Sequence, residues 1–390
     1  MENAKCKVRA PPFILHFSFC TLHFAFPLNK ETRMAQEVGF GVVGLGMGQT
    51  HCRDITDAQG ARLVAVCDVD ESRLNPVAEK YQARKFGRFE EMLRDSEIDV
   101  INVCTYSGMH ADMAIAAMEA GKHVISEKPA DVNLAKIDAM IAASKRTGKK
   151  LQVIFQERFM PVNRKIKEAI ESGRLGRLIG CHGDLRWWRA QSYYDNSADH
   201  WRGTWRWDGG GSLMNQGVHT MDLMQWFLGP VASVFGVTGV YTHKIETEDK
   251  AAAVLKFESG AIGTINTMTC AYPGLATELF IQGEQGAIEK SDANIRTWRV
   301  QGETKEAEEA EEAEVLAEFG RKEKGVSLSS DPNALPFRGH RVQVEDMVNA
   351  IREGRPPTIT GESARNAVAI NLAIYESART GREVRVRDMG

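Results

Sequence analysis

The chain lacks three features that would assign it to a special class of protein: a strong net charge, paired cysteines and a long uninterrupted apolar run. Its formal net charge is only -3 over 390 residues, so no overall field attracts nucleic acid or an anionic membrane surface. The seven cysteines are widely spaced and include no Cys-x-x-Cys pair, which argues against a zinc knuckle or a disulfide framework. We therefore expect a cytoplasmic protein with no metal, nucleic-acid or membrane partner.

The one stretch that superficially matches a targeting segment is residues 13–28, an apolar run behind three basic residues. Two histidines and a serine interrupt this run, and no small-x-small cleavage site follows it. The run is also too short and too polar to span a bilayer. Because Met34 opens a sequence typical of a cytosolic N-terminus, we expect residues 1–33 to be an extension outside the fold. An early translation start or a dispensable segment would explain it, and an export signal is the alternative.

Length and composition predict a soluble globular protein of two domains. Hydrophobic residues make up 43% of the chain and charged residues 26%, which is ordinary for such proteins. A chain of 390 residues is long enough for two domains that each bury a core.

The first half begins with the order of elements found in a dinucleotide-binding unit. An apolar segment at residues 38–43 is followed by a glycine turn, a helix-compatible stretch and a second strand at 62–67 that ends at Asp68. The formal Gly-x-Gly-x-x-Gly match at residues 39–44 overlaps the first strand, so we treat it as coincidence. The expected turn consists of Gly44, Gly46 and Gly48, whose backbone N–H groups would face a pyrophosphate. An ordinary strand–helix turn is the alternative.

Asp68 bears on the choice of cofactor. It lies 24 residues after Gly44, close to the spacing at which a carboxylate reaches the adenosine ribose. A carboxylate accepts hydrogen bonds from ribose hydroxyls and repels a 2′-phosphate, so NAD is favoured over NADP. The nearby Arg73 leaves NADP as the alternative.

Strands and helices continue to alternate as far as residue 155, which predicts a parallel sheet. Further strands are expected at residues 99–104, 123–126 and 151–155, with a helix at 113–120. Ligands bind beyond the carboxyl ends of such strands, and Glu127-Lys128-Pro129 follows one of them. Lys128 could point its amine into the site, or it could be solvated or paired with Glu127.

The second half reads as a different architecture. After a helix at 161–172, strands predominate, and their turns predict a mostly antiparallel sheet. They are expected at residues 179–188, 231–242, 251–257, 261–269 and 278–282. A sheet with few helices has an open face to bury, so a homodimer or homotetramer through this sheet is expected. Residues 305–319 read as a solvated helical or mobile segment, and 340–352 and 364–380 as amphipathic helices before a last strand at 384–386.

Seven tryptophans and tyrosines lie within residues 187–207, interleaved with arginines. Aromatic rings pack against the C–H faces of sugars, and arginines pair with carboxylates or phosphates. The stretch is either part of a substrate site or a well-packed loop with surface arginines.

The most informative stretch is residues 208–230. We expect a helix from Ser212, which would cap it, to Leu228, ended by Gly229 and Pro230. Asn215, His219 and Asp222 fall at i, i+4 and i+7 and would share one helix face. Three glycines at 209–211 would allow close backbone approach. This face is either an active-site wall or the polar side of a solvated helix.

Together these motifs resemble the Gfo/Idh/MocA oxidoreductases, the family of glucose–fructose oxidoreductase and inositol dehydrogenase. The resemblance covers residues 38–386 and rests on the Gly44 turn with His51, Asp68, residues 120–124 leading to Glu127-Lys128-Pro129, residues 209–219 and the tail at 356–386. It implies an α/β protein with a doubly wound Rossmann sheet at residues 34–155. A substrate-binding and oligomerisation domain with an open, mostly antiparallel sheet would span 156–338. Helices at 339–390 would pack back towards the Rossmann domain.

The resemblance also assigns roles to residues. Lys128 matches the family's catalytic lysine and His219 its catalytic histidine, while Asn215 stands where many members carry an aspartate. Such variants look like a branch that includes dehydrogenases of UDP-linked aminosugar uronates. Substrate contacts are expected at Asn215, Arg158, Arg189, Tyr194 and Arg202, and Asp222 would brace the helix or orient the imidazole. Cofactor contacts are expected at Gly44, Gly46, Met47, Gly48, Asp68, Thr105, His110, Glu127 and Lys128.

The implied activity is an NAD-dependent dehydrogenase acting on a secondary alcohol of a sugar, sugar nucleotide or cyclitol. Neutral His219 would be the general base, and Lys128 would stabilise the developing alkoxide. A redox-cycling sugar enzyme that retains its NAD, such as an epimerase, eliminase or glycosidase, is the alternative within enzymes. A non-catalytic NAD-binding sensor is the alternative outside them.

Overall fold

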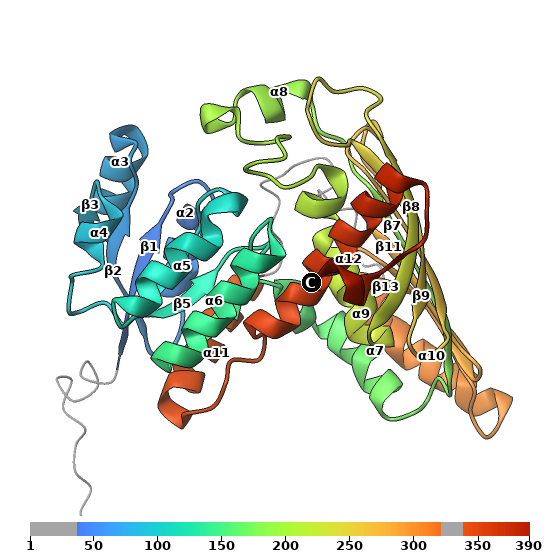
Figure 1. The fold of residues 1–390 in the computed structure, drawn as a ribbon. Helices are drawn as coiled ribbons and strands as arrows, with labels where there is room; N and C mark the ends of the chain where they lie inside the picture. The colour runs from blue at the N-terminus through green and yellow to red at the C-terminus, as the bar shows by residue number, and fades with distance from the viewer. Residues whose placement is uncertain (1–36, 321–337) are drawn as a thin grey trace, which may run out of the picture. The chain divides into compact units, whose positions relative to one another are not determined.

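The computed structural model describes residues 37–320 and 338–390. The predicted N-terminal extension, residues 1–33, lies outside the described residues. By its contacts, Val38–Gly390 is one unit. It contains a six-stranded sheet and an eight-stranded sheet, which confirms the predicted α/β class (Figure 1). None of the helices among the described residues has the length and apolarity that crossing a bilayer would require.

The first sheet is parallel throughout, with the strand order β3-β2-β1-β4-β5-β6 of a dinucleotide-binding fold. Its strands are β1 (Val38–Val43), β2 (Ala61–Cys67), β3 (Arg84–Phe86), β4 (Val100–Val103), β5 (His123–Ser126) and β6 (Leu151–Val153). Its helices are α2 (Gly48–Thr56), α3 (Glu71–Tyr81), α4 (Phe89–Met92), α5 (His110–Glu119) and α6 (Leu134–Thr147).

Both faces of this sheet are buried, which explains why its strands read as continuous apolar runs. All six residues of β1 are buried. Phe40 and Val42 pack in a core with residues of α2 and α11 (Gly339–Glu353), whereas Val43 packs in a second core with residues of α5 and α6. Helices therefore cover the two faces, as the doubly wound prediction requires.

The second sheet has the order β13-β12-β11-β7-β10-β9-β8-β14 and is antiparallel except between β7 and β10. Its strands are β7 (Leu178–Arg186), β8 (Val231–Gly239), β9 (Lys250–Phe257), β10 (Ile262–Met268), β11 (Glu278–Gly283), β12 (Gly286–Ser291), β13 (Asn294–Val300) and β14 (Val384–Arg385). Associated helices are α7 (Pro161–Glu171), α8 (Gln191–Asp195), α9 (Val218–Leu228), α10 (Lys305–Phe319) and α12 (Gly361–Thr380).

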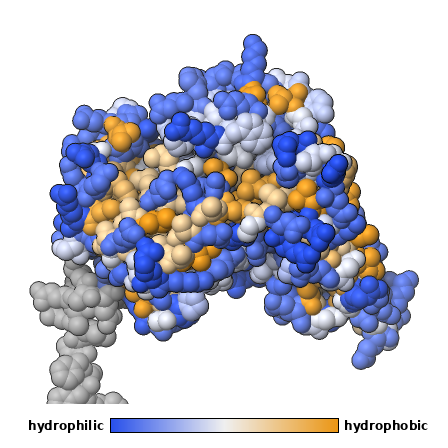
Figure 2. Space-filling view, in the orientation of Figure 1, coloured by the Kyte–Doolittle hydropathy of each residue, from blue (hydrophilic) through white to orange (hydrophobic). Residues whose placement is uncertain are grey.

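The helices of this half gather on one face of the second sheet. Helix α9 packs against β7, and α12 packs against β8 and α9 (Figure 1). On the other face, apolar side chains of four strands are exposed, among them Ile179, Phe235, Val237, Val254 and Ile262. In Figure 2, orange atoms lie along the right-hand margin, where β8 and β9 are seen edge-on.

One part of the C-terminal half differs from the prediction. Residues 305–319 do form a helix, α10, but it packs against β13 and buries Val315, so it is not a wholly solvated segment. Of residues 339–390, α11 packs against α2 of the first sheet. Helix α12 contacts α6 and β6 of the first half as well as β8 and α9 of the second, and β14 extends the second sheet at its edge.

Candidate functional site

The glycine turn between β1 and α2 leaves an open stretch of backbone. Gly44 has a φ of +85°, and a Cβ there would lie 2.6 Å from the carbonyl oxygen of Cys104 at the end of β4. No atom would lie within 4 Å of a Cβ on Gly46, and the next residue, Met47, is exposed. Helix α2 then begins at Gly48. An uncovered turn at a helix N-terminus fits the pyrophosphate of a dinucleotide.

Asp68 follows β2 and lies beside this turn. Its Oδ2 accepts a hydrogen bond from the N–H of Leu45 at 2.8 Å. Its Oδ1 accepts one from the N–H of Asp70 at 2.9 Å and one from Arg73 at 3.1 Å. A carboxylate at the tip of the second strand fits the ribose hydroxyls of NAD. The guanidinium that could have favoured NADP is instead paired with this carboxylate.

Thr105 and His110 lie just past the carboxyl end of β4. One ring nitrogen of His110 lies 2.7 Å from the carbonyl oxygen of Pro129, and the other lies 3.1 Å from that of Thr105. The histidine is buried, so it ties the ends of β4 and β5 together. Its role in this structure is to hold two strand ends at the sheet edge where the predicted cofactor residues gather.

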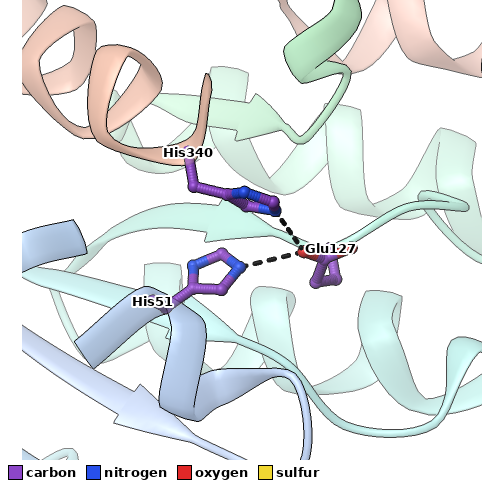
Figure 3. Close-up of side chains that lie close together, drawn as sticks. All are labelled: His51, Glu127 and His340. Carbon is purple, nitrogen blue, oxygen red and sulfur yellow. Dashed lines mark hydrogen bonds and ion pairs between the residues drawn. The ribbon is translucent and has the colours of Figure 1, made fainter. Parts of the chain in front are cut away.

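Glu127, predicted to contact the cofactor, has its side chain held between two histidines from distant parts of the chain (Figure 3). Its Oε1 lies 2.9 Å from Nε2 of His51 in α2 and 3.3 Å from Nε2 of His340 in α11. Its Oε2 accepts the backbone N–H of Lys128 at 3.1 Å. Burial would raise the pKa of Glu127, but the hydrogen bonds from His340 and His51 hold it well below its usual value.

Among the described residues, this is the one trio of ligand-type side chains close enough to hold a metal ion, with ligand atoms within 4.8 Å of one another. Hydrogen bonds already account for the arrangement, because Nδ1 of His51 also has a partner, the Asn102 side chain at 2.8 Å. All three residues are buried. The trio fastens α11 and α2 to the backbone that carries Lys128.

Lys128 lies at the carboxyl end of β5, directly after Glu127, which is hydrogen-bonded to His51 and His340. Its Nζ donates a hydrogen bond to the backbone carbonyl of Asn215 at 2.9 Å. Burial lowers the pKa of Lys128, while the negative charges of Glu127 and Asp208 oppose that shift. The contact brings together two predicted site residues that are 87 positions apart.

The stretch predicted as one helix from Ser212 to Leu228 is two elements. Ser212–Gln216 forms a π-helical turn, and α9 begins only at Val218. Ser212 does not cap the predicted helix, because the Ser212 hydroxyl lies against Thr267 and Glu248 instead. The cap comes from Glu248, whose carboxylate accepts the N–H groups of Gly211 and Leu213 at 2.9 and 2.8 Å. The predicted helix start was therefore wrong in its capping residue.

The three glycines at 209–211 do allow close approach, but to other parts of this chain. Cβ atoms there would overlap Val132 beyond β5, the Tyr375 hydroxyl of α12 and the backbone carbonyl of Glu248. The glycines therefore let three distant elements meet at the start of the π-helical turn.

His219 lies in the first turn of α9, and its ring meets that of Phe155 edge-on with centroids 5.9 Å apart. Burial and the nearby charge of Lys128 lower the pKa of His219 to about 3, so the imidazole is neutral at physiological pH. Its Nδ1 is buried and has no hydrogen-bond partner among the described residues. The residue is partly exposed, and a neutral imidazole beside a lysine can accept a proton from a hydroxyl group.

Arg158 and Asp222 form a buried ion pair. The guanidinium donates to both carboxylate oxygens, at 2.7 and 2.5 Å, and also to Ser363 at 2.9 Å. Arg158 was predicted to contact substrate, but here its polar atoms are turned to α9 and α12. Asp222 accordingly braces the helix and is not hydrogen-bonded to the imidazole of His219.

The predicted contacts in the aromatic stretch differ in exposure. Tyr194 is buried, and its hydroxyl lies 2.9 Å from that of Thr269. Arg189 is buried over the ring of Trp187, at 4.9 Å from its centroid, and donates to the carbonyl of Trp188. Arg202 is only partly buried, and it stacks over Tyr193 at 4.4 Å and Trp201 at 5.0 Å.

Sequence reasoning missed Asp208 and Glu248. Asp208 begins the glycine-rich stretch, and its Oδ1 accepts the side-chain amide of Asn215 at 2.5 Å. The signal for Asp208 was its place one residue before the three glycines. For Glu248, which lies 37 positions after the glycine it caps, the sequence carried no signal.

Comparison with known proteins agrees with this geometry. A family model described as oxidoreductase family, NAD-binding Rossmann fold, matches residues 38–155, and the GFO/IDH/MocA C-terminal domain matches residues 163–289. The myo-inositol 2-dehydrogenase of Thermotoga maritima is 27% identical over 356 residues, 90% of this chain and 98% of that protein. The scyllo-inositol 2-dehydrogenase (NAD(+)) of Bacillus subtilis is 26% identical over 363 residues, 90% of this chain and 97% of that protein.

Among solved structures, the WlbA dehydrogenase from Bordetella pertussis in complex with NADH and UDP-GlcNAcA is 31% identical. It aligns with a TM-score of 0.79 over 90% of this chain and 98% of that one. The predicted fold, cofactor and enzyme class are thereby confirmed. The chain belongs to the Gfo/Idh/MocA family of NAD-binding oxidoreductases.

Proposed function

We propose that this protein is an NAD-dependent dehydrogenase that oxidises a secondary alcohol of a sugar, sugar nucleotide or cyclitol. The observation that carries the proposal is the meeting of Lys128 with the 212–219 segment. The lysine amine is hydrogen-bonded to Asn215, and neutral His219 lies one turn further along. This pair lies at the carboxyl edge of a sheet whose glycine turn fits the cofactor.

The residues that would hold NAD are those of the glycine turn, Gly44, Gly46, Met47 and Gly48, with Asp68 beside them at the ribose. Thr105, His110 and the backbone at Glu127 and Lys128 complete the edge of the sheet. Bound NAD supplies the acceptor for the hydride that leaves the substrate carbon.

His219 and Lys128 divide the work on the reacting hydroxyl. The partly exposed imidazole of His219 takes the O–H proton, which is possible because it starts neutral. The Lys128 amine donates a hydrogen bond to the same oxygen and stabilises its developing negative charge. The side chain of Asn215 positions this hydroxyl or its neighbour.

The substrate class is supported by the relatives and by one arginine. Two relatives are inositol dehydrogenases, and WlbA was solved with a sugar nucleotide that carries a uronate. Arg202 stacks on two aromatic rings near Lys128 and Asp208. Its buried Nε has no hydrogen-bond partner among the described residues. An anionic group on the substrate would suit this guanidinium.

The open face of the second sheet is proposed as the contact between copies in a homodimer or homotetramer. Exposed apolar side chains of β7, β8, β9 and β10 gather there, and a two-fold contact buries the same patch on both partners. The five cysteines among the described residues are free thiols, which supports a reducing compartment such as the cytoplasm.

A panel of free sugars, uronates, inositols and UDP-sugars tests the proposed activity. With NAD⁺ added, at least one compound should give stoichiometric NADH, measured by absorbance. Nicotinamide that copurifies with the protein and is regenerated in each cycle would instead identify a redox-cycling enzyme. If no compound gave NADH while NAD⁺ bound tightly, the dehydrogenase proposal would be wrong and a sensor role would remain.

A further inference from the structure

The structure contains a carboxylate next to the side chain of Asn215. Asp208 lies just before the three glycines and is buried at 1% exposure. Its Oδ1 accepts the Asn215 side-chain N–H at 2.5 Å, and its Oδ2 accepts the backbone N–H of Gly203 at 2.8 Å. Both oxygens therefore act as acceptors, the arrangement of an ionised carboxylate.

This contact fixes the orientation of the Asn215 amide. A carboxylate only accepts hydrogen bonds, so the amide must turn its Nδ2 towards Asp208. Its Oδ1 is then the side-chain atom left to meet a ligand. The backbone carbonyl of the same residue accepts Lys128 Nζ at 2.9 Å. Asp208, Asn215 and Lys128 thus form a chain of carboxylate, amide and amine.

The charges around Asp208 come from four other elements. Lys128 follows β5, and Arg202 follows the Ala198–His200 turn. Tyr194 in α8 and Tyr375 in α12 also lie within electrostatic range. Burial raises the pKa of Asp208 to about 6, although the hydrogen bonds from Gly203 and Asn215 and the charges of Arg202 and Lys128 oppose the shift.

We propose that Asp208 is a positioning residue of the active site, which acts through its hydrogen bond to the side chain of Asn215. In its ionised form it turns the amide oxygen of Asn215 towards the reacting hydroxyl and keeps a negative charge near Lys128. Protonation of Asp208 converts one oxygen into a donor and releases the amide to rotate. The role in turnover rests on the proposed dehydrogenase function, whereas the hydrogen-bonded chain and the titration of Asp208 do not.

The proposal predicts an acid limb in the pH profile of kcat/KM near pH 6. His219 does not account for such a limb, because its pKa of about 3 leaves it neutral throughout this range. Asp208→Asn should therefore lower kcat/KM at pH 8 about 100-fold, the order of loss that misplacement of a substrate-positioning group causes. It should also abolish the limb near pH 6 and leave the Kd for NAD⁺ unchanged.

A charge exchange separates positioning from a purely structural role. The double variant Asp208→Asn with Asn215→Asp keeps one amide and one carboxylate at the same contact. It should recover kcat/KM to within about 10-fold of the wild type, while the single variant does not. An unchanged acid limb in Asp208→Asn, or a double variant no more active than the single one, would overturn the proposal.

A second measurement needs no substrate. Because the folded pKa of Asp208 lies above its unfolded value of 3.8, the wild type should lose stability relative to Asp208→Asn as the pH rises from 4 to 6. Urea unfolding at several pH values measures this difference. A pH-independent difference would show that Asp208 does not titrate as proposed, even if the correct substrate had not been found. If the difference were seen but no substrate reacted, only the proposed activity would fail.

Discussion

His219 shows how much a residue's surroundings decide its chemistry. It lies on a helix among buried neighbours and close to Lys128, and both effects disfavour the imidazolium. The sequence identified the residue through its helical spacing from Asn215 and Asp222 and through the family resemblance. It could not supply the protonation state, because that depends on Lys128, which is 91 positions away in the sequence and close in space only after folding.

Protonation of His219 should destabilise the fold in acid. Its pKa falls from 6.5 to about 3 on folding, so this contribution to stability is present above pH 6.5 and is lost as the pH falls towards 3. Glutamine does not titrate, so the variant His219→Gln does not lose this contribution. On going from pH 7 to pH 5, the free energy of unfolding of the variant should therefore rise relative to that of the wild type, by at most about 1.4 kcal/mol per pH unit.

Urea unfolding at pH 7, 6 and 5 measures the effect, and His200→Gln, at an exposed histidine, is the control. A wild type and His219→Gln variant with parallel pH dependences would contradict a depressed pKa for His219.

The substrate contacts predicted in the second half illustrate what sequence alone cannot settle. Arg158 and Tyr194 have residue types that suit a sugar site, but their partners Asp222 and Thr269 are 64 and 75 positions away. Nothing in the local pattern distinguishes an arginine that faces a ligand from one that pairs across the core. Lys128 and Asp68 were easier to place because each lies within two residues of the end of a strand of the parallel sheet.

At the scale of elements, the two sheets were largely predictable because the order of strands and helices differs between the two halves. Strands that alternate with helices predicted the parallel sheet, and strands joined by turns with few helices predicted the antiparallel one. The hairpin of β12 and β13 was missed because both strands mix charged and apolar residues over only six and seven positions. The π-helical turn before α9 was missed because its cap comes from Glu248, near the start of β9.

The start of the π-helical turn should not tolerate a side chain at Gly211. A Cβ there would overlap the carbonyl of Glu248, so Gly211→Ala should lower the free energy of unfolding by about 1–3 kcal/mol. Gly87→Ala is the matched control, since no atom lies within 4 Å of its Cβ position, and it should change stability by less than about 0.5 kcal/mol. Equal effects of the two substitutions in urea unfolding would contradict this packing.

A side chain at Gly46 should weaken cofactor binding without lowering stability. The Cβ of Gly46→Ala would have no atom of the protein within 4 Å, so the free energy of unfolding of this variant should match that of the wild type. If the turn holds the pyrophosphate, the added methyl group occupies space that the cofactor needs, and the Kd for NAD⁺ should rise about 10-fold or more. Isothermal titration calorimetry with NAD⁺ measures this change. Unchanged affinity would place the cofactor elsewhere.

At the scale of the whole molecule, the open face of the second sheet is the feature that bears on association between copies. The apolar open face was expected from the pattern of strands with few helices, and the structure places Phe235 of β8 directly beside Val254 of β9. In a two-fold contact, the same patch of a second copy covers this face. The prediction that residues 1–33 are an extension outside the fold concerns residues that the structure does not describe.

Charges on the open face should dissociate the oligomer. Phe235→Glu and Val254→Glu each place a carboxylate in the proposed interface, where burial without a partner is costly. Light scattering after size-exclusion chromatography should show monomers for both variants and a dimer or tetramer for the wild type. Val69→Glu, at a highly exposed residue of the first half, should keep the wild-type mass. If the interface variants kept it too, the copies would associate through another surface.

The most direct test of the central claim is the rate of NADH formation by Lys128→Ala and His219→Ala with a substrate found in the panel. Each should lower kcat about 100-fold or more, while NAD⁺ affinity measured by calorimetry stays within about 2-fold of the wild type because neither side chain builds the glycine turn. Lys136→Ala, at an exposed lysine of α6, should retain full activity. Near-normal turnover in either site variant, with NAD⁺ bound, would contradict the assignment of Lys128 and His219 as the catalytic pair.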